Sequence, residues 1–297
     1  MKIPTGGVAF FDSGIGGLTV LNACRKLLPN EIFYYYGDNA RAPYGNLPPK
    51  KILQYTLDAF ALFKRLQVKA TVLACNTVTA LCVERLREKY SFPIIGAEPA
   101  VFPAAKEGGD VFVLTTRATF NSSRFQLLCK RASGTYPQTK LILTPCDGLA
   151  AVIEERLFDE RDFSFALPQG QPNAVVLGCT HYVYIKEQIE KYYGVPVYDG
   201  NQGIAERLKT LINGLETKKN RDGQPPFKIL SKKIGIFDHK KPVECNNEKT
   251  RNKTNKCSPL KKRKILEICG IEGNSQVFFL GSGKEKNSAF YERMFGF

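Results

Sequence analysis

The chain has 297 residues, of which 43% are hydrophobic, so it is long and apolar enough for two modest domains and is not intrinsically disordered. Its formal net charge is +15, but most of this charge lies in one segment. Residues 217–264 hold 16 of the 43 Lys and Arg and only 4 of the 28 Asp and Glu, so the remainder of the chain is nearly neutral. No apolar run is long enough to span a membrane, no signal peptide is recognisable, and nine cysteines without close pairs favour a reducing compartment, so we expect a cytoplasmic protein.

The first predicted strand covers residues 8–11 and leads through the glycine-rich residues 14–17 into a helix. Such a turn exposes backbone N–H groups at a helix N-terminus, which suits an anion. A dinucleotide-binding loop is a rival interpretation, because Asp38 follows about where a ribose-binding acid stands. Thr19 occupies the place of the third glycine, however, and Asp12 would set a carboxylate beside the pyrophosphate, so we do not favour it.

The next segments lead to a cysteine at a strand end. Residues 31–36 predict an aromatic strand, 37–46 a Pro/Gly loop and 51–68 an amphipathic core helix. The apolar run 71–74 then predicts a buried parallel strand, and Cys75 follows it where a new helix begins. Because a helix N-terminus favours a thiolate, we expect the pKa of Cys75 to lie below the usual value of about 8.5.

The second half of the sequence repeats this pattern. Residues 8–11 align with 111–114, residues 93–95 align with 196–198, and the apolar run before Cys179 matches the run before Cys75. Two similar α/β halves, each delivering one cysteine, are the simplest explanation of these matches. If the halves face each other, the two thiols meet in the cleft between them, as a two-base proton transfer requires.

Other polar side chains of the second half extend this interpretation. His181 lies two residues after Cys179, and residues i and i+2 of an extended strand share a face, so a proton relay is favoured over a buried structural histidine. Glu154 is a candidate assistant to the second thiol, or else a solvated helix acid. Thr115, Thr116 and Thr119 follow the first strand of this half, and one of them can contact a ligand.

A compositional change at residue 217 predicts an insertion, partly disordered, from 217 to 274, before a closing strand at 277–280. Its basic residues, from 217 to 264, can contact nucleic acid through phosphates, although such a run is more often simply solvated. The same region holds Cys245, Cys257, Cys269 and His239, but these lack the closely spaced pairs of structural zinc sites, so we expect no metal.

Four blocks together resemble the signatures of bacterial glutamate racemases, within the aspartate/glutamate racemase superfamily. They are FDSGIGG at residues 11–17, GDNARAPYG at 37–45, ACNT at 74–77 and LGCTHY at 177–182. They occur in the family's order across roughly the first 205 residues, and FFLGSG at 278–283 resembles the family's closing strand.

The resemblance implies an α/β fold with two similar parallel-sheet domains, related by a pseudo-two-fold axis, and an active site in the cleft between them. We expect residues 1–97 plus 206–297 to form the first domain and 98–205 the second. The implied activity is the interconversion of L- and D-glutamate, without cofactor or metal, to supply D-glutamate for peptidoglycan. A homodimer with no membrane association is also implied.

The resemblance further implies residue roles. Cys75 acts on the D-isomer and Cys179 on the L-isomer. The implied catalytic residues are Cys75, Cys179, Asp12, His181 and Glu154. The implied substrate-binding residues are Asp12, Ser13, Tyr44, Gly45, Asn76, Thr77, Thr180 and His181.

Two alternative functions remain open at this point. An aspartate racemase is the nearest one, but Thr180-His181 after the second cysteine, rather than Thr-Glu, argues for glutamate. A nucleic-acid-binding regulatory protein is the alternative from another class, with the basic insertion as its binding segment and a relic racemase body. Retention of Cys75, Cys179 and Asp12 argues against a relic.

Overall fold

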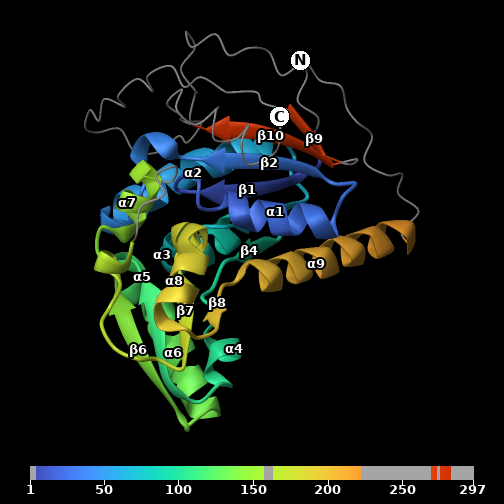
Figure 1. Ribbon diagram of the computed structural model, residues 1–297. Coiled ribbons are helices and arrows are strands. Elements are labelled where there is room, and N and C mark those ends of the chain that lie inside the picture. The colour runs from blue at the N-terminus through green and yellow to red at the C-terminus, as the bar shows by residue number, and fades with distance from the viewer. Residues whose placement is uncertain (1–4, 157–162, 222–268, 273–274, 282–297) are drawn as a thin grey trace, which may run out of the picture.

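The structure is a computed structural model that describes residues 5–156, 163–221, 269–272 and 275–281 (Figure 1). Its strands form two sheets, a six-stranded one in the order β4-β3-β1-β2-β10-β9 and a four-stranded one in the order β6-β5-β7-β8. We call the sheets with their covering helices the first and second units. Within the described residues, no helix is both long and apolar enough to cross a membrane.

The first unit is a sheet covered by helices on both faces. Its strands are β4 (Ile94–Gly96), β3 (Ala70–Leu73), β1 (Val8–Asp12), β2 (Ile32–Gly37), β10 (Ser275–Gly281) and β9 (Cys269–Glu272). Its helices are α1 (Leu18–Leu27) and α9 (Asn201–Arg221) on one face, α2 (Pro49–Arg65) and α3 (Asn76–Lys89) on the other, with the 3₁₀ turns η1 (Asn39–Arg41) and η2 (Tyr44–Asn46) after β2. All neighbouring strands run parallel except β9, which pairs antiparallel with β10.

The alternation of side chains along β1 explains the two layers. Val8 and Phe10 belong to the core beneath α1 and α9, whereas Ala9 and Phe11 belong to the core beneath α2 and α3. Successive side chains of a strand point to opposite faces, so a strand that is buried on both faces must be apolar throughout.

The second unit is built in the same way. Its strands are β6 (Thr139–Pro145), β5 (Gly109–Thr115), β7 (Ala174–Gly178) and β8 (Val197–Tyr198), all parallel. Its helices are α4 (Val101–Ala105), α5 (Arg117–Phe120), α6 (Ser123–Thr135), α7 (Leu149–Arg156) and α8 (Lys186–Tyr193), with the 3₁₀ turns η3 (Ser164–Ala166) and η4 (Thr180–Ile185). The helices α4 and α6 cover one face of the sheet, and α7, α8 and η4 cover the other.

The predicted internal repeat is confirmed by the strand order. The order β4-β3-β1-β2 of the first sheet recurs as β8-β7-β5-β6 in the second, so each aligned sequence pair occupies the same position in its sheet. The expected fold class, two similar parallel-sheet α/β units, is therefore correct.

The chain passes between the units twice, after β4 and again near α9. The helix α9 begins at Asn201, and its residues Ile204, Ala205 and Leu208 share a core with α1 of the first unit. Within the range expected as the insertion, 217–274, the structure has the end of α9 and the strand β9, while residues 222–268 and 273–274 lie outside the described residues.

Candidate functional site

The two cysteines that the sequence singles out stand at equivalent ends of equivalent strands. Cys75 follows β3 and occupies the N-cap position of α3, and Cys179 follows β7 and precedes η4. Asp12 is the last residue of β1, the strand beside β3. Ligand sites of parallel α/β sheets form at these carboxyl ends, and here residues from the ends of both sheets contact one another.

Around Cys75 the structure brings together Asp12 and Ser13. The Cys75 Sγ–H donates a hydrogen bond to Ser13 Oγ at 3.6 Å, and the Gly14 N–H donates to Asp12 Oδ1 at 2.8 Å. Asp12 is fully buried, and this burial raises the pKa of its carboxyl group.

The expected low pKa of Cys75 is wrong. Burial of the thiol, and next the charge of Asp12, raise its pKa to about 12. The backbone N–H of Val78, in the first turn of α3, and the Ser13 hydroxyl lower it, but they do not compensate for the lost solvation. Cys75 is therefore a neutral thiol in this closed arrangement, beside a carboxylate that can accept its proton.

The side chains around Cys179 differ from those around Cys75. His181 Nδ1 lies 3.9 Å from Cys179 Sγ, and His181 Nε2 forms an ion pair with Glu154 Oε2. Burial lowers the pKa of His181, but its bonds to Cys179 and Glu154 raise it well above the ordinary value of 6.5. The raised pKa favours the imidazolium form, and the ring lies where it can exchange a proton with the sulfur.

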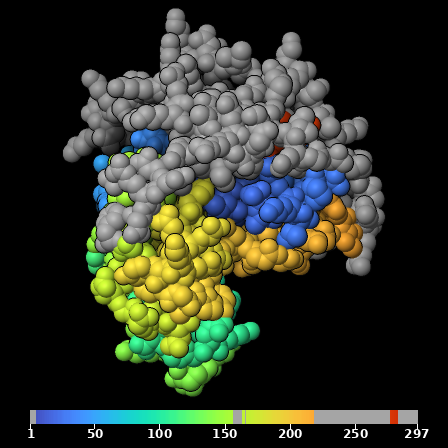
Figure 2. Space-filling view, viewed as in Figure 1, coloured from blue at the N-terminus to red at the C-terminus, as the bar shows by residue number. Residues whose placement is uncertain are grey.

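The glycine-rich loop after β1 contacts the second unit directly. Thr180 Oγ1 donates to Asp12 Oδ2 at 3.2 Å, and the Tyr184 hydroxyl donates to the Ile15 carbonyl at 2.7 Å. A Cβ atom on Gly16 would lie 2.4 Å from Thr180 Oγ1. In the space-filling view, the yellow segment of η4 and α8 borders the blue segment of α1 (Figure 2). The glycines thus permit close approach of the two units.

A group of hydroxyls joins the units on another side of the site. Thr77 Oγ1 lies 3.0 Å from Thr116 Oγ1 and 3.4 Å from Thr119 Oγ1. A Cβ atom on Gly45 would lie 3.1 Å from Thr116 Cβ, so this loop also abuts the second unit. Sequence reasoning left open which threonine after β5 contributes, and the structure brings Thr116 and Thr119 to Thr77.

Tyr44 and Asp38 belong to a network that the sequence did not reveal. The Tyr44 hydroxyl donates to Asp38 Oδ2, and Arg41 Nη1 donates to both Asp38 oxygens, at 2.8 and 2.6 Å. Asp38 is fully buried, so its carboxylate holds the loop after β2 and is not available to a ribose. Its spacing from the glycine-rich loop had suggested a ribose-binding acid, an interpretation that Thr19 and Asp12 already disfavoured.

The space between the units is nearly closed. A cavity lined by Asn76, Cys179, Thr180 and other residues has a volume of about 10 Å³, which is room for about one water molecule. This cavity is too small for an amino acid. A larger hollow of about 670 Å³ lies at α2 and the end of α3, where it is lined by residues such as Asp58 and Lys89, and contains none of the predicted site residues.

In the part of the chain that the structure describes, no three His, Cys, Asp or Glu side chains form a group that could hold a metal ion. Six described cysteines are free thiols. Of the residues weighed for zinc, Cys245, Cys257 and His239 lie outside the described residues.

Comparison with known proteins identifies the family. The profile of the Asp/Glu/Hydantoin racemase family matches residues 19–208, more than half of the chain. The chain belongs to the Asp/Glu/Hydantoin racemase family. Within this racemase family it is similar to the glutamate racemase of Clostridium perfringens (strain ATCC 13124), at 37% identity over 73% of this chain and 87% of that protein. The glutamate racemase of Clostridium novyi (strain NT) is also 37% identical, over 77% of this chain and 91% of that protein.

Solved structures of racemases share the fold. Escherichia coli glutamate racemase, in complex with L-glutamate and the activator UDP-MurNAc-ala, superposes with a TM-score of 0.63 at 30% identity, over 71% of this chain and 83% of that one. Glutamate racemase of Francisella tularensis subsp. tularensis SCHU S4, in complex with D-glutamate, has a TM-score of 0.61 at 28% identity, over 71% and 82%. The site of this racemase-family chain thus lies in a shared fold.

Proposed function

We propose that the chain is a glutamate racemase that interconverts L- and D-glutamate with its own two thiols and supplies D-glutamate for peptidoglycan. The observation that carries this proposal is the pair of buried cysteines at equivalent strand ends of two repeated units, each beside its own acid-base partner. The two faces of a carbon need two separate bases, and one from each unit meets that need. The proposal requires neither cofactor nor metal, because the thiols supply both bases.

In the direction from L- to D-glutamate, we assign proton removal to Cys179 as a thiolate, with the His181 imidazolium as its partner. Cys75, as a neutral thiol, then donates its proton to the opposite face of the α-carbon. At the end Cys179 carries the abstracted proton and Cys75 is a thiolate. Asp12, whose carboxyl pKa is raised by burial, can return a proton to Cys75.

In the reverse direction the roles exchange. Asp12 accepts the Cys75 proton, the Cys75 thiolate removes the α-proton of D-glutamate, and Cys179 reprotonates the other face. Glu154 holds the imidazole of His181 by its Nε2, so Nδ1 faces the sulfur. In this proposal Glu154 positions His181 rather than touching substrate.

The carbanion is the costly species, since a carboxylate stabilises it poorly. We assign its stabilisation to preorganised donors at the closed interface, which act most strongly where water is excluded. We assign this role to the side chains of Ser13, Asn76, Thr77 and Thr180, together with the backbone N–H of Gly45. Tyr44 is assigned a positioning role, because its hydroxyl is bonded to Asp38.

The test is racemisation by the purified chain, in the presence of a chelator and without pyridoxal phosphate, starting from L-glutamate and separately from L-aspartate. Chiral chromatography should find D-glutamate and far less D-aspartate. Conversion of aspartate alone would leave the thiol chemistry standing and make the substrate assignment wrong. Conversion of neither amino acid would overturn the proposed function.

A homodimer and a cytoplasmic location remain part of this proposal, as expected from the sequence. Contact with nucleic acid through residues 217–264 remains a separate hypothesis, and residues 222–264 of that range lie outside the described residues.

A further inference from the structure

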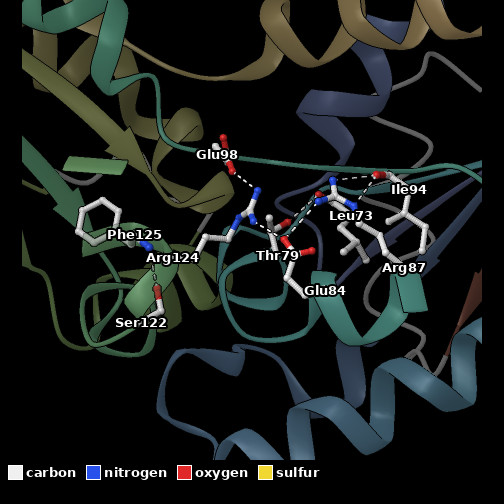
Figure 3. Close-up of polar contacts among 9 residues, drawn as sticks. All are labelled: Leu73, Thr79, Glu84, Arg87, Ile94, Glu98, Ser122, Arg124 and Phe125. Carbon is white, nitrogen blue, oxygen red and sulfur yellow. Dashed lines mark hydrogen bonds and ion pairs between the residues drawn. The ribbon is translucent and has the colours of Figure 1, made fainter. Parts of the chain in front are cut away.

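A cluster of charged side chains joins the two units (Figure 3). Arg124, in the first turn of α6, pairs through Nη1 with Glu84 Oε1 at 2.5 Å and through Nη2 with Glu98 Oε1. Glu84 belongs to α3 of the first unit, and Glu98 lies between β4 and α4, where the chain crosses to the second unit. One guanidinium thus binds both the first unit and the crossover.

The Glu84 side of the cluster is anchored to the first sheet. Arg87 Nη1 lies 3.3 Å from Glu84 Oε1, and Arg87 Nε and Nη2 donate to the Ile94 carbonyl at 3.3 and 3.1 Å. Ile94 begins β4, the edge strand of that sheet, so its carbonyl has room for a side-chain partner. Arg87 therefore fixes Glu84 relative to the sheet that carries Cys75.

The Arg124 side is anchored to the second unit. The Ser122 hydroxyl caps α6 by accepting the Phe125 N–H at 3.2 Å, and Phe125 is buried in the core of the second sheet. A cation in the first turn of a helix faces the positive end of the helix dipole, so α6 gains nothing from Arg124 itself. The ion pairs with Glu84 of the first unit and with Glu98 at the crossover account for the position of the Arg124 side chain.

The cluster is connected to the reacting groups on both sides. The helix α3, which carries Glu84, begins immediately after Cys75, and α6 follows the turn that carries Thr116 and Thr119. Glu98 lines the small cavity beside Cys179. Because that cavity is too small for an amino acid, contacts between the units must loosen in each turnover. The side chains of Arg124, Glu84 and Glu98 are 31%, 63% and 37% exposed, so water can replace their contacts.

We propose that Arg124 is a positioning residue that holds the two units in the closed arrangement, with Cys75 and Cys179 on either side of the cleft, and releases them when its ion pairs break. The proposal rests on the proposed function, which supplies the reason for opposing the thiols.

The test measures how fast each buried cysteine is alkylated, since Cys75 and Cys179 become accessible only when the units separate. The native full chain is treated with iodoacetamide, and the rate at each cysteine is followed by peptide mass spectrometry. Arg124→Gln should speed alkylation of both cysteines about threefold to tenfold, the range that one or two exposed ion pairs correspond to. Cys24, in the core of the first unit, should keep its slow rate and reports global unfolding.

Two further variants sharpen the result. Arg124→Lys keeps the charge and should restore most of the protection, and about 1 M salt should move the wild type toward the Arg124→Gln rates. Arg117→Gln is the matched control, because Arg117 forms an exposed ion pair with Asp147 inside the second unit and should leave both rates unchanged.

Two outcomes would overturn the proposal. One is equal alkylation rates at Cys75 and Cys179 in the wild type and in Arg124→Gln, and the other is a parallel rise at Cys24. Neither readout depends on racemisation, so failure of the wild type to racemise would refute the proposed function separately from this inference.

Discussion

Asp12 illustrates a residue whose charge destabilises the fold while it serves the site. Its folded pKa is raised by burial, so the ionised form reduces stability at neutral pH, and stability rises as the pH falls through that raised pKa toward the ordinary value of 3.8. Asp12→Asn keeps the shape and can still accept the Gly14 N–H. We expect the free energy of unfolding to rise by about 1–2 kcal/mol at pH 7, which raises the thermal midpoint by about 2–6 °C. We also expect racemisation to be about 10²-fold slower. An unchanged midpoint in a melting experiment would show that Asp12 is not a buried charge.

Glu154→Gln tests the proton partner of Cys179. Removing the carboxylate lowers the pKa of His181, so the imidazolium deprotonates at lower pH. The alkaline limb of kcat/KM for L-glutamate should therefore shift to lower pH, which a pH–rate profile measures. The ion pair also contributes stability that is fully present below about pH 6.5 and is lost as the pH rises through the raised folded pKa. An unshifted limb would mean that Glu154 does not act through His181.

At this scale the sequence singled out side chains that the structure brings together, but it did not predict the direction of the pKa shift of Cys75. Cys75 and Cys179 could be found because each ends an apolar strand and the pattern occurs twice. The pKa of Cys75 could not be found, because the burial that raises it depends on how the second unit closes over the first. The partner of Asp38 was missed for the same kind of reason, since Arg41 and Tyr44 reach it through a folded loop.

Among the elements, the glycine-rich loop gives the sharpest prediction. Gly16→Ala places a methyl group 2.4 Å from Thr180 Oγ1, so the units must move apart or the loop must distort. We expect about 1–3 kcal/mol lower stability in urea unfolding, and a loss of activity larger than the unfolded fraction explains. Gly134→Ala is the matched control, because Gly134 lies in α6 with no atom within 4 Å of the added carbon.

The stability of Gly134→Ala should equal that of the wild type or exceed it by at most about 0.5–1 kcal/mol, since alanine has the higher helix propensity and Gly134 lies in the last turn of α6. Full activity of Gly16→Ala would contradict the close approach of loop and second unit.

The order of strands and helices was largely predictable at this scale, because strands buried on both faces read as continuous apolar runs. The strand β9 and the full extent of α9 could not be predicted, because both lie where the sequence becomes basic and polar. Pairing with β10 and packing against α1 form these elements, and neither contact is visible in the local sequence.

At the scale of the whole molecule, the basic segment can be separated from the racemase body. Residues 222–268 carry 13 of the 43 Lys and Arg, and every predicted site residue precedes α9. Replacing 222–268 by a short Gly/Ser linker should leave racemisation unchanged and should abolish any salt-sensitive DNA binding in a titration. Lost racemisation with retained folding, judged by circular dichroism, would tie the segment to the enzyme.

The opposed thiols are the central claim, and exchange of the α-proton in deuterated buffer tests it most directly. The wild type, Cys75→Ser and Cys179→Ser are compared with L- and D-glutamate, without added cofactor. We predict that the wild type incorporates deuterium while converting either isomer, and that each serine variant slows turnover in both directions about 10²–10⁴-fold, because one face of the carbon then lacks its base. Turnover retained in either variant would contradict the two-thiol mechanism.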